Sequence, residues 1–218
     1  MEMEITMKKC ALHSLGCKVN SYETQAMQKM MESAGYEIVP FGEEIADIYI
    51  INTCSVTNIA DRKSRQMIHK AKKLNPEAVV AAAGCYVESA GDNIDEDVDI
   101  VIGNNEKSHL IEILNEYFEH MDKEKSVDIG KATGFDELNI DSPLEHTRAY
   151  VKIQDGCNRF CSYCIIPYVR GRIRSRKPDD VMAEIKRVAA SGCKEVVLTG
   201  IHLSLIHISE PTRRVVIS

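Results

Sequence analysis

Three cysteines stand close together in the second half of the chain, Cys157, Cys161 and Cys164, in the pattern C-x3-C-x2-C. Thiolates at this spacing on one loop can hold one face of a metal centre. A structural zinc site takes four ligands, and the next histidine is distant, at His202. Three thiolates on a cube-shaped iron–sulfur cluster leave one iron open for a substrate or cofactor. The spacing therefore favours an open cluster, with a zinc knuckle or chance spacing as the alternatives.

A second set of cysteines is spread through the first half, at Cys17, Cys54 and Cys85. Each follows the carboxyl end of an expected strand. In an open parallel sheet these ends line one crevice, where ligands collect, so the three thiols could form a second three-ligand site. Position alone favours the alternative of three buried thiols, because Cys is among the most buried residue types.

The elements that must position these cysteines alternate between strands and helices. Such alternation predicts an α/β fold in which an open parallel sheet has helical cover. The expected strands are Lys9–Leu15, Asp47–Asn52, Ala78–Ala83 and Asp99–Ile102, and the expected helices are Ser21–Ala34, Ala60–Leu74 and Asn105–His120. Ser21 is the expected cap of the first helix, and Thr57 or Asn58 that of the second.

A second unit begins after a polar stretch. A strand at Arg148–Gln154 precedes the cysteine loop, and a helix at Pro178–Ser191 and a strand at Lys194–Thr199 follow it. This strand–helix–strand unit cannot bury a complete core of its own. The pattern predicts a first domain at 8–120, a linker at 121–147 and the start of a second domain at 148–204.

Composition and charge narrow the class of protein. The longest aliphatic run, Ala78–Ala83, is far shorter than the roughly 20 residues of a membrane-spanning helix, and the acidic N-terminus is not a secretory signal. The chain is therefore expected to be cytoplasmic and not membrane-bound, where cysteines at fixed spacings favour metal chemistry over disulfides. The net charge of −6 combines −13 over residues 86–145 with +7 over residues 148–177.

The basic stretch contains arginines at alternating positions. On an extended segment the side chains of Arg170, Arg172, Arg174 and Arg176 would share one side. Guanidinium groups on one side can contact RNA phosphates or a substrate carboxylate, and a solvated charged surface is the equal alternative. The helix that carries Arg62, Lys63 and Arg65 gives a weaker indication of the same kind.

The residues around all six cysteines resemble a known family. The loop Cys157–Cys164 after a strand is similar to the radical S-adenosylmethionine (SAM) superfamily. The segments Leu15-Gly-Cys-Lys-Val-Asn20, Asn52-Thr-Cys-Ser-Val-Thr57 and Gly84-Cys-Tyr86 resemble the N-terminal domain of the methylthiotransferases within it. The resemblance covers about Lys9 to Ser204. It implies that the second unit begins a partial (β/α) barrel of the radical SAM type.

The resemblance also implies ligands and cofactors. Cys17, Cys54 and Cys85 would hold an auxiliary 4Fe-4S cluster, and Cys157, Cys161 and Cys164 the radical SAM 4Fe-4S cluster. Cys10 and Cys193 match no ligand position and are expected to be packed thiols. His202 lies where the superfamily contacts the methionine amino group of SAM. No catalytic side chain is predicted.

The chain is most similar to family members that modify tRNA. They add a methylthio group to C2 of N6-threonylcarbamoyladenosine in the anticodon loop, with electrons from a donor that the sequence does not identify. A non-catalytic iron–sulfur electron-transfer module, or the same reaction on another tRNA nucleoside or a ribosomal protein, is the alternative. Residues 205–218 depart from the family pattern and resemble a translated sequencing adaptor, so the chain is expected to be a fragment that is inactive on its own.

Overall fold

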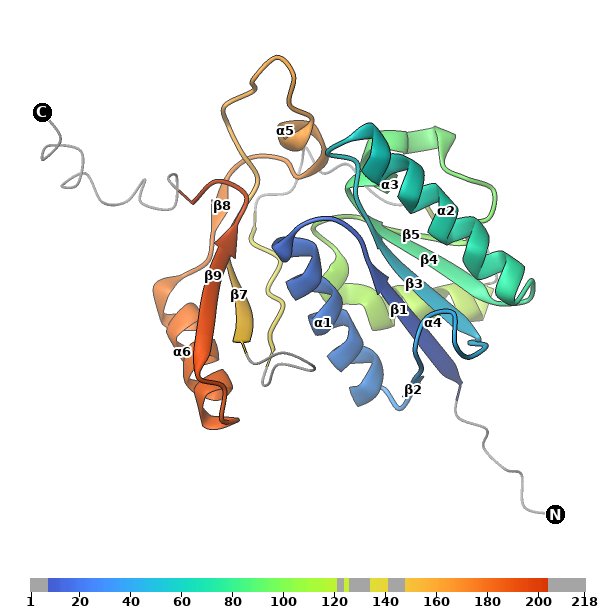
Figure 1. The fold of residues 1–218 in the computed structure, drawn as a ribbon, viewed down its shortest axis with the longest axis horizontal. Helices are drawn as coiled ribbons and strands as arrows, with labels where there is room; N and C mark the ends of the chain where they lie inside the picture. The colour runs from blue at the N-terminus through green and yellow to red at the C-terminus, as the bar shows by residue number, and fades with distance from the viewer. Residues whose placement is uncertain (1–7, 121–123, 126–133, 141–147, 204–218) are drawn as a thin grey trace, which may run out of the picture.

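The first unit of the molecule is a parallel sheet of six strands. The computed structural model describes residues 8–120, 124–125, 134–140 and 148–203 (Figure 1). The strand order is β2-β1-β3-β4-β5-β6, and every neighbouring pair is parallel. The strands are β1 (Lys9–Ser14), β2 (Glu37–Ile38), β3 (Ile48–Thr53), β4 (Val79–Gly84), β5 (Ile100–Ile102) and β6 (Glu124–Lys125).

Helices cover both faces of this sheet, which confirms the predicted α/β class. The elements are α1 (Lys18–Ser33), α2 (Asn58–Leu74), α3 (Cys85–Ala90) and α4 (Leu110–His120), with 3-10 turns η1 (Gly91–Asn93) and η2 (Lys107–His109). Alternate residues of β3 serve the two faces. Ile48 and Ile50 pack with α1 and α4, whereas Tyr49 and Ile51 pack with α2 and α3. Burial on both faces explains why the first four residues of this strand, Ile48–Ile51, form a continuous apolar run.

The two helices that follow the cysteine loops begin differently. Helix α2 has Thr57 as its N-cap, and the Thr57 side chain accepts a hydrogen bond from the Ala60 N–H at 3.1 Å, as predicted. Helix α1 begins at Lys18, and the prediction of Ser21 as its cap is wrong. Its N-cap is Cys17, whose side chain makes no capping hydrogen bond. The missing cap is the reason that the sequence pattern placed this start too late.

The second unit is a small sheet with order β8-β7-β9. Strands β7 (Arg148–Asp155) and β9 (Glu195–Gly200) are parallel, and β8 (Arg174–Ser175), which was not predicted, pairs antiparallel with β7. Helix α5 (Ile166–Val169) follows the cysteine loop, and α6 (Pro178–Ala190) connects to β9. The predicted strand–helix–strand order is confirmed.

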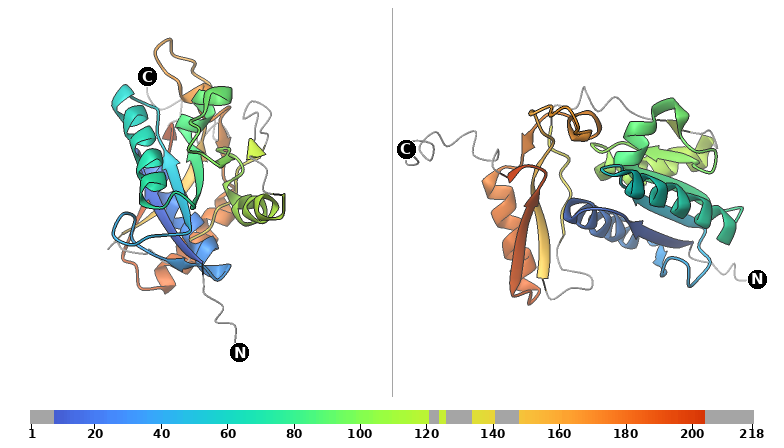
Figure 2. Two further views of the ribbon diagram at one scale, coloured as in Figure 1. Left: turned by 90° about the vertical axis from the view of Figure 1, so that its right-hand side faces the viewer. Right: turned by 45° about the horizontal axis from the view of Figure 1, so that its top comes forward.

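Helix α1 lies between the two units (Figures 1 and 2). Met27 and Met31 face the six-stranded sheet, while Tyr22 and Ala26 pack on the opposite side, against Leu138 and Ile140. Part of the stretch expected to be a linker is therefore core, because Leu138 and Ile140 are almost fully buried. The segment 205–218, which was expected to be a translated sequencing adaptor, lies outside the described residues.

Candidate functional site

The first three cysteines follow three neighbouring strands. Cys17, Cys54 and Cys85 come after the carboxyl ends of β1, β3 and β4, and the register pairs Thr53 with Gly84. The strand order reverses direction between β1 and β3. In open α/β sheets, ligands bind in the crevice outside such a switch point. Cys54 and Cys85 are buried there, and Cys17 is exposed.

Two glycines let the loops approach closely. Gly16 has φ +98°, and a Cβ at this position would lie 2.6 Å from the sulfur of Cys54. Gly84 has φ +95°, and its missing Cβ would collide with the carbonyl oxygen of Thr53. A side chain at either position would force the loops apart, so the glycines form a cradle that fits a ligand set of three soft sulfur donors.

Polar side chains hold the backbone of these loops, and one of them, Asn20, also accepts a long hydrogen bond of 4.0 Å from the sulfur of Cys17. Asn20 donates to the carbonyls of Leu15 at 2.7 Å and Thr53 at 2.8 Å. The hydroxyl of Ser64 accepts from the N–H of Cys54 at 3.0 Å and donates to the carbonyl of Cys54 at 2.9 Å. The backbone of Cys54 is therefore satisfied, and its thiol is available as a ligand.

The electrostatic environment of Cys85 is mixed. Burial raises the pKa of the Cys85 thiol, whereas the positive charges of Arg170 and Lys107 oppose that rise. Cations beside a buried sulfur favour its thiolate form, which is the form that binds metal.

The second three cysteines lie on the loop after β7. Cys157 is buried, Cys161 is exposed and Cys164 is half-buried. The N–H of Cys164 donates to the carbonyl of Cys161 at 2.9 Å, which closes a turn, and the N–H of Cys157 donates to the carbonyl of Gly171 at 3.1 Å. The structure thus holds this set on one compact loop.

Aromatic residues shape the outer part of that loop. Phe160 has a positive φ of 46°, is edge-on to Tyr168 at 5.6 Å between ring centroids, and lies 4.7 Å from the guanidinium carbon of Arg172. Tyr163 is 91% exposed and Tyr168 is 65% exposed. Exposed rings beside an arginine can stack on a flat ligand such as a base.

The spacing of the sulfurs bears on the kind of metal centre. Three thiolates on one zinc ion, each ~2.3 Å from it, lie within ~4.6 Å of one another. In the described part of the chain, one group has its donor atoms within 4.8 Å of one another, and it is His69, Asp95 and Asp97, a surface cluster without cysteine. Neither cysteine set is in that group, so neither is drawn together around a single ion, and the thiolates of a 4Fe-4S cube bind different irons and need not meet this limit.

The arginine run has a different role from the one predicted. Arg170, Arg174 and Arg176 are almost fully buried, and Arg172 is exposed. Arg176 forms a buried ion pair with Glu184. Both predicted alternatives, guanidinium groups on one side toward phosphate or a solvated charged surface, are therefore wrong for these three arginines, because they make contacts inside the protein. By contrast, Arg62, Lys63 and Arg65 on α2 are exposed.

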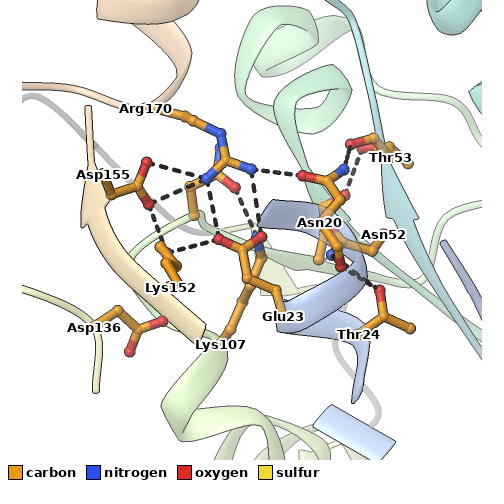
Figure 3. A network of polar contacts seen from close by, with 12 residues as sticks. Asn20, Glu23, Thr24, Asn52, Thr53, Lys107, Asp136, Lys152, Asp155 and Arg170 are labelled. Atoms are coloured by element: carbon orange, nitrogen blue, oxygen red, sulfur yellow. Dashed lines mark hydrogen bonds and ion pairs between the residues drawn. The ribbon is translucent and has the colours of Figure 1, made fainter. Parts of the chain in front are cut away.

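Sequence analysis missed a cluster of five buried charges between the two units (Figure 3). Glu23 of α1 contacts Lys107 at 2.5 Å, Lys152 at 2.7 Å and Arg170 at 3.0 Å. Asp155 contacts Lys152 at 2.7 Å and Arg170 at 3.1 Å. A lysine inside an otherwise buried strand, as at Lys152, is the signal that could have revealed the cluster, since Lys is rarely buried unless paired.

These charges hold one another ionised. Burial alone would raise the pKa of Glu23, but Arg170, Lys107 and Lys152 keep it well below its usual value. Burial likewise opposes ionisation of Asp155, yet Arg170 and Lys152 lower its pKa to about 2. With two carboxylates and three cations, the cluster has one excess positive charge.

The remaining predicted residues are placed as follows. His202 lies just after β9, and its N–H donates to the side-chain oxygen of Gln154 at 2.8 Å. Cys10 is fully buried, and burial raises its pKa to about 12, as a packed thiol requires. Cys193 is half-buried, and its sulfur donates to the carbonyl of Glu195 at 3.2 Å.

Comparison with known proteins identifies both units. Residues 9–103 match the uncharacterized protein family UPF0004, and residues 151–215 match the Radical SAM superfamily. The second match extends to residue 215 and so includes most of residues 205–218, which were expected to be a translated sequencing adaptor. The chain therefore carries a region similar to UPF0004, with a parallel α/β fold, followed by a region similar to the Radical SAM superfamily.

Relatives define the family more closely. The chain is 44% identical to the threonylcarbamoyladenosine tRNA methylthiotransferase MtaB of Bacillus subtilis, over 90% of this chain and 44% of the relative. It is 44% identical to the protein of the same name from Aquifex aeolicus, over 90% of this chain and 48% of the relative. It is 34% identical to the tRNA-2-methylthio-N(6)-dimethylallyladenosine synthase of Photorhabdus laumondii, over 89% and 42%. Along most of its own length the chain is similar to these relatives, and it spans a little under half of theirs.

Proposed function

We propose that the full-length protein, of which this chain is a fragment expected to be inactive on its own, transfers a methylthio group to C2 of N6-threonylcarbamoyladenosine in the anticodon loop of tRNA, and the tests below use the full-length protein. The names of its relatives support this substrate. The observation that carries the proposal is a contact between one element that bears a cysteine of the first set and one that follows the loop of the second set. Helix α5, next to the second set, packs against α3, which begins at Cys85 (Figure 1). Two metal centres at neighbouring positions can act on one substrate atom.

We assign a 4Fe-4S cluster to each set, the auxiliary cluster to Cys17, Cys54 and Cys85, and the SAM-binding cluster to Cys157, Cys161 and Cys164. When bound, the clusters and SAM supply the electron, the radical chemistry and the sulfur that an inert adenine C2–H requires. The residues of the chain hold the two centres, keep the sulfurs of Cys54 and Cys85 away from water, and present an open loop at Cys161.

The outer surface of the second cysteine loop carries side chains that fit recognition of an RNA loop. Single-stranded RNA loops are recognised by stacking unpaired bases on aromatic and arginine side chains. Phe160, Tyr163 and Tyr168 are exposed on or beside this loop, and Arg172 lies against Phe160. These residues offer a stacking surface beside the proposed SAM-binding cluster.

We also propose that the protein works in the cytoplasm with an electron donor still to be identified. None of the eight cysteines, all of which lie in the described residues, forms a disulfide, as is usual in a reducing compartment. No helix in the described part of the chain has the length and apolar character needed to cross a bilayer.

The cofactor assignment is tested by anaerobic reconstitution with iron and sulfide. The protein is expected to bind about eight irons, four for each cube. The variant Cys157→Ala/Cys161→Ala/Cys164→Ala should bind about half as much iron and should lose cleavage of SAM to 5′-deoxyadenosine under dithionite. The matched variant Cys17→Ala/Cys54→Ala should lose the other half and keep SAM cleavage. Iron content that is unchanged in the triple variant would contradict the assignment.

The reaction and substrate need separate measurements. A protein that binds both clusters but forms no 5′-deoxyadenosine would be an electron-transfer module. Nucleoside analysis of tRNA from a strain that lacks the gene should show loss of the methylthio derivative of N6-threonylcarbamoyladenosine. Unchanged levels of that nucleoside, or loss of a different methylthio nucleoside, would contradict the substrate.

A further inference from the structure

Arg170 is a fully buried residue that connects the two units. It follows α5 directly and lies six positions after Cys164. One guanidinium nitrogen, Nη2, donates to Oδ1 of Asn20 at 2.6 Å, and the other, Nη1, donates to Glu23 at 3.0 Å and to both oxygens of Asp155 at 3.1 Å (Figure 3). A single side chain therefore joins α1 of the first unit to β7 of the second.

The partners of Arg170 lie beside the proposed ligands of both clusters. Asn20 is three residues after Cys17, and its amide holds the carbonyls of Leu15 and Thr53, which border the first cysteine set. Asp155 is two residues before Cys157, and its Oδ1 accepts the N–H of Gly156 at 2.7 Å. One nitrogen of the guanidinium group is thus linked through Asn20 to the backbone beside the first cysteine set. The other is linked through Asp155 to the backbone beside the second set.

The surroundings of Arg170 make this connection rigid. A second hydrogen bond also connects the two units, because the side chain of Asn104 donates to the carbonyl of Val169 at 2.6 Å. Any slide of one unit on the other would separate buried charges from their partners, which is costly in a low-dielectric interior. The planar fork of arginine suits this task, since it bonds in several fixed directions at once.

We infer that Arg170 is a positioning residue that sets the spacing between the two cysteine sets through Asn20 and Asp155. This inference rests on the proposed function, in which both clusters serve one adenine C2. Displacement of reacting groups by about 1 Å can cost on the order of 100-fold in rate. Arg170 would therefore matter for transfer of the methylthio group more than for cleavage of SAM.

The test compares Arg170→Met, Arg170→Lys and a control, Arg174→Met. Arg174 is a buried arginine of the same segment whose guanidinium donates to the carbonyls of Arg170 and Arg172. After reconstitution and reduction with dithionite, pulsed EPR measures the magnetic interaction between the two clusters, which depends on their separation. A second assay measures methylthio product per 5′-deoxyadenosine formed.

Both Arg170 variants are expected to bind as much iron as the unmodified protein but to change the magnetic interaction and lower the product ratio about 100-fold. Arg174→Met should leave both unchanged. Arg170→Lys keeps the charge, but an ammonium group cannot span Asn20 and Asp155. An unchanged interaction and ratio in either Arg170 variant at full iron content would overturn the inference.

Asn20→Ala provides a second route if the Arg170 variants lose their clusters, because it leaves the five buried charges in place. The same altered interaction is expected, and an unchanged one would overturn the inference. Failure of the proposed function is distinguishable, since it is seen in the unmodified protein as iron well below about eight per chain, or as no 5′-deoxyadenosine. Either result would overturn the inference together with the proposed function.

Discussion

Replacing Glu23 with glutamine keeps the size of the side chain but removes the central negative charge of the buried cluster. Lys152 and Arg170 would keep Asp155 as a partner. Lys107 would keep the neutral oxygen of Asn104 at 2.8 Å, and so would become a buried cation without a counter-charge. The excess charge of the cluster would rise from one to two.

The expected cost of Glu23→Gln follows from that unpaired charge. Breaking a buried ion pair by removing one partner costs about 3–5 kcal/mol, out of a total stability of about 5–15 kcal/mol for a domain. Urea unfolding of the metal-free chain, followed by circular dichroism at neutral pH, measures this loss. The double variant Glu23→Gln/Lys107→Met should recover about 2 kcal/mol or more, because it removes the unpaired cation together with the carboxylate.

A control on the same helix isolates the effect of burial. Glu32 pairs with Lys29 at 2.7 Å, but its side chain is 34% exposed. Glu32→Gln should therefore cost about 0.5 kcal/mol or less, as is usual for exposed pairs. If Glu23→Gln cost no more than Glu32→Gln, the buried cluster would not be held by the charge of Glu23, and the reasoning would be refuted.

Three further results are expected. Gly16→Ala should lose about half of the reconstituted iron, because a methyl group there meets the sulfur of Cys54, whereas Gly35→Ala, which has φ +88° but open space around it, should keep it all. Asp155 has a depressed pKa, so its contribution to stability is present above pH 3.8 and is lost as the pH falls toward 2, which urea unfolding across this range would detect. Burial raises the pKa of Glu88 from 4.5 to about 6, so its contribution is present below pH 4.5 and lost as the pH rises through 6. Glu88→Gln should therefore raise stability at neutral pH by ~1–2 kcal/mol, and no gain there in the same unfolding assay would contradict the shift.

Local patterns were sufficient for the elements that carry the cysteines. The apolar run Ile48–Ile51 predicted a buried strand, and of the two expected caps of the helix that follows, Thr57 and Asn58, the structure has Thr57. The six cysteines could also be placed at strand ends from the sequence, which is where the structure has them. Their role as cluster ligands stays a prediction.

The charge cluster could not be predicted in the same way, because its members come from distant parts of the chain. Glu23 and Arg170 are 147 positions apart, and nothing in the sequence around either one indicates that it pairs with the other. Alternation at Arg170–Arg176 predicted one common side for these arginines, but Arg170, Arg174 and Arg176 have different partners, and a period of two does not say whether a side chain meets water or protein groups. The answer depends on how the second unit packs against α1.

The position of α1 has a consequence for recombining relatives. By chain order this helix belongs to the N-terminal half, yet Tyr22 and Glu23 find their partners in the C-terminal half. A chimera joined between the halves would set a foreign α1 face against Glu184 and Arg170. Hybrid proteins from this family should therefore fold best when the outward face of α1 is inherited together with the C-terminal parent.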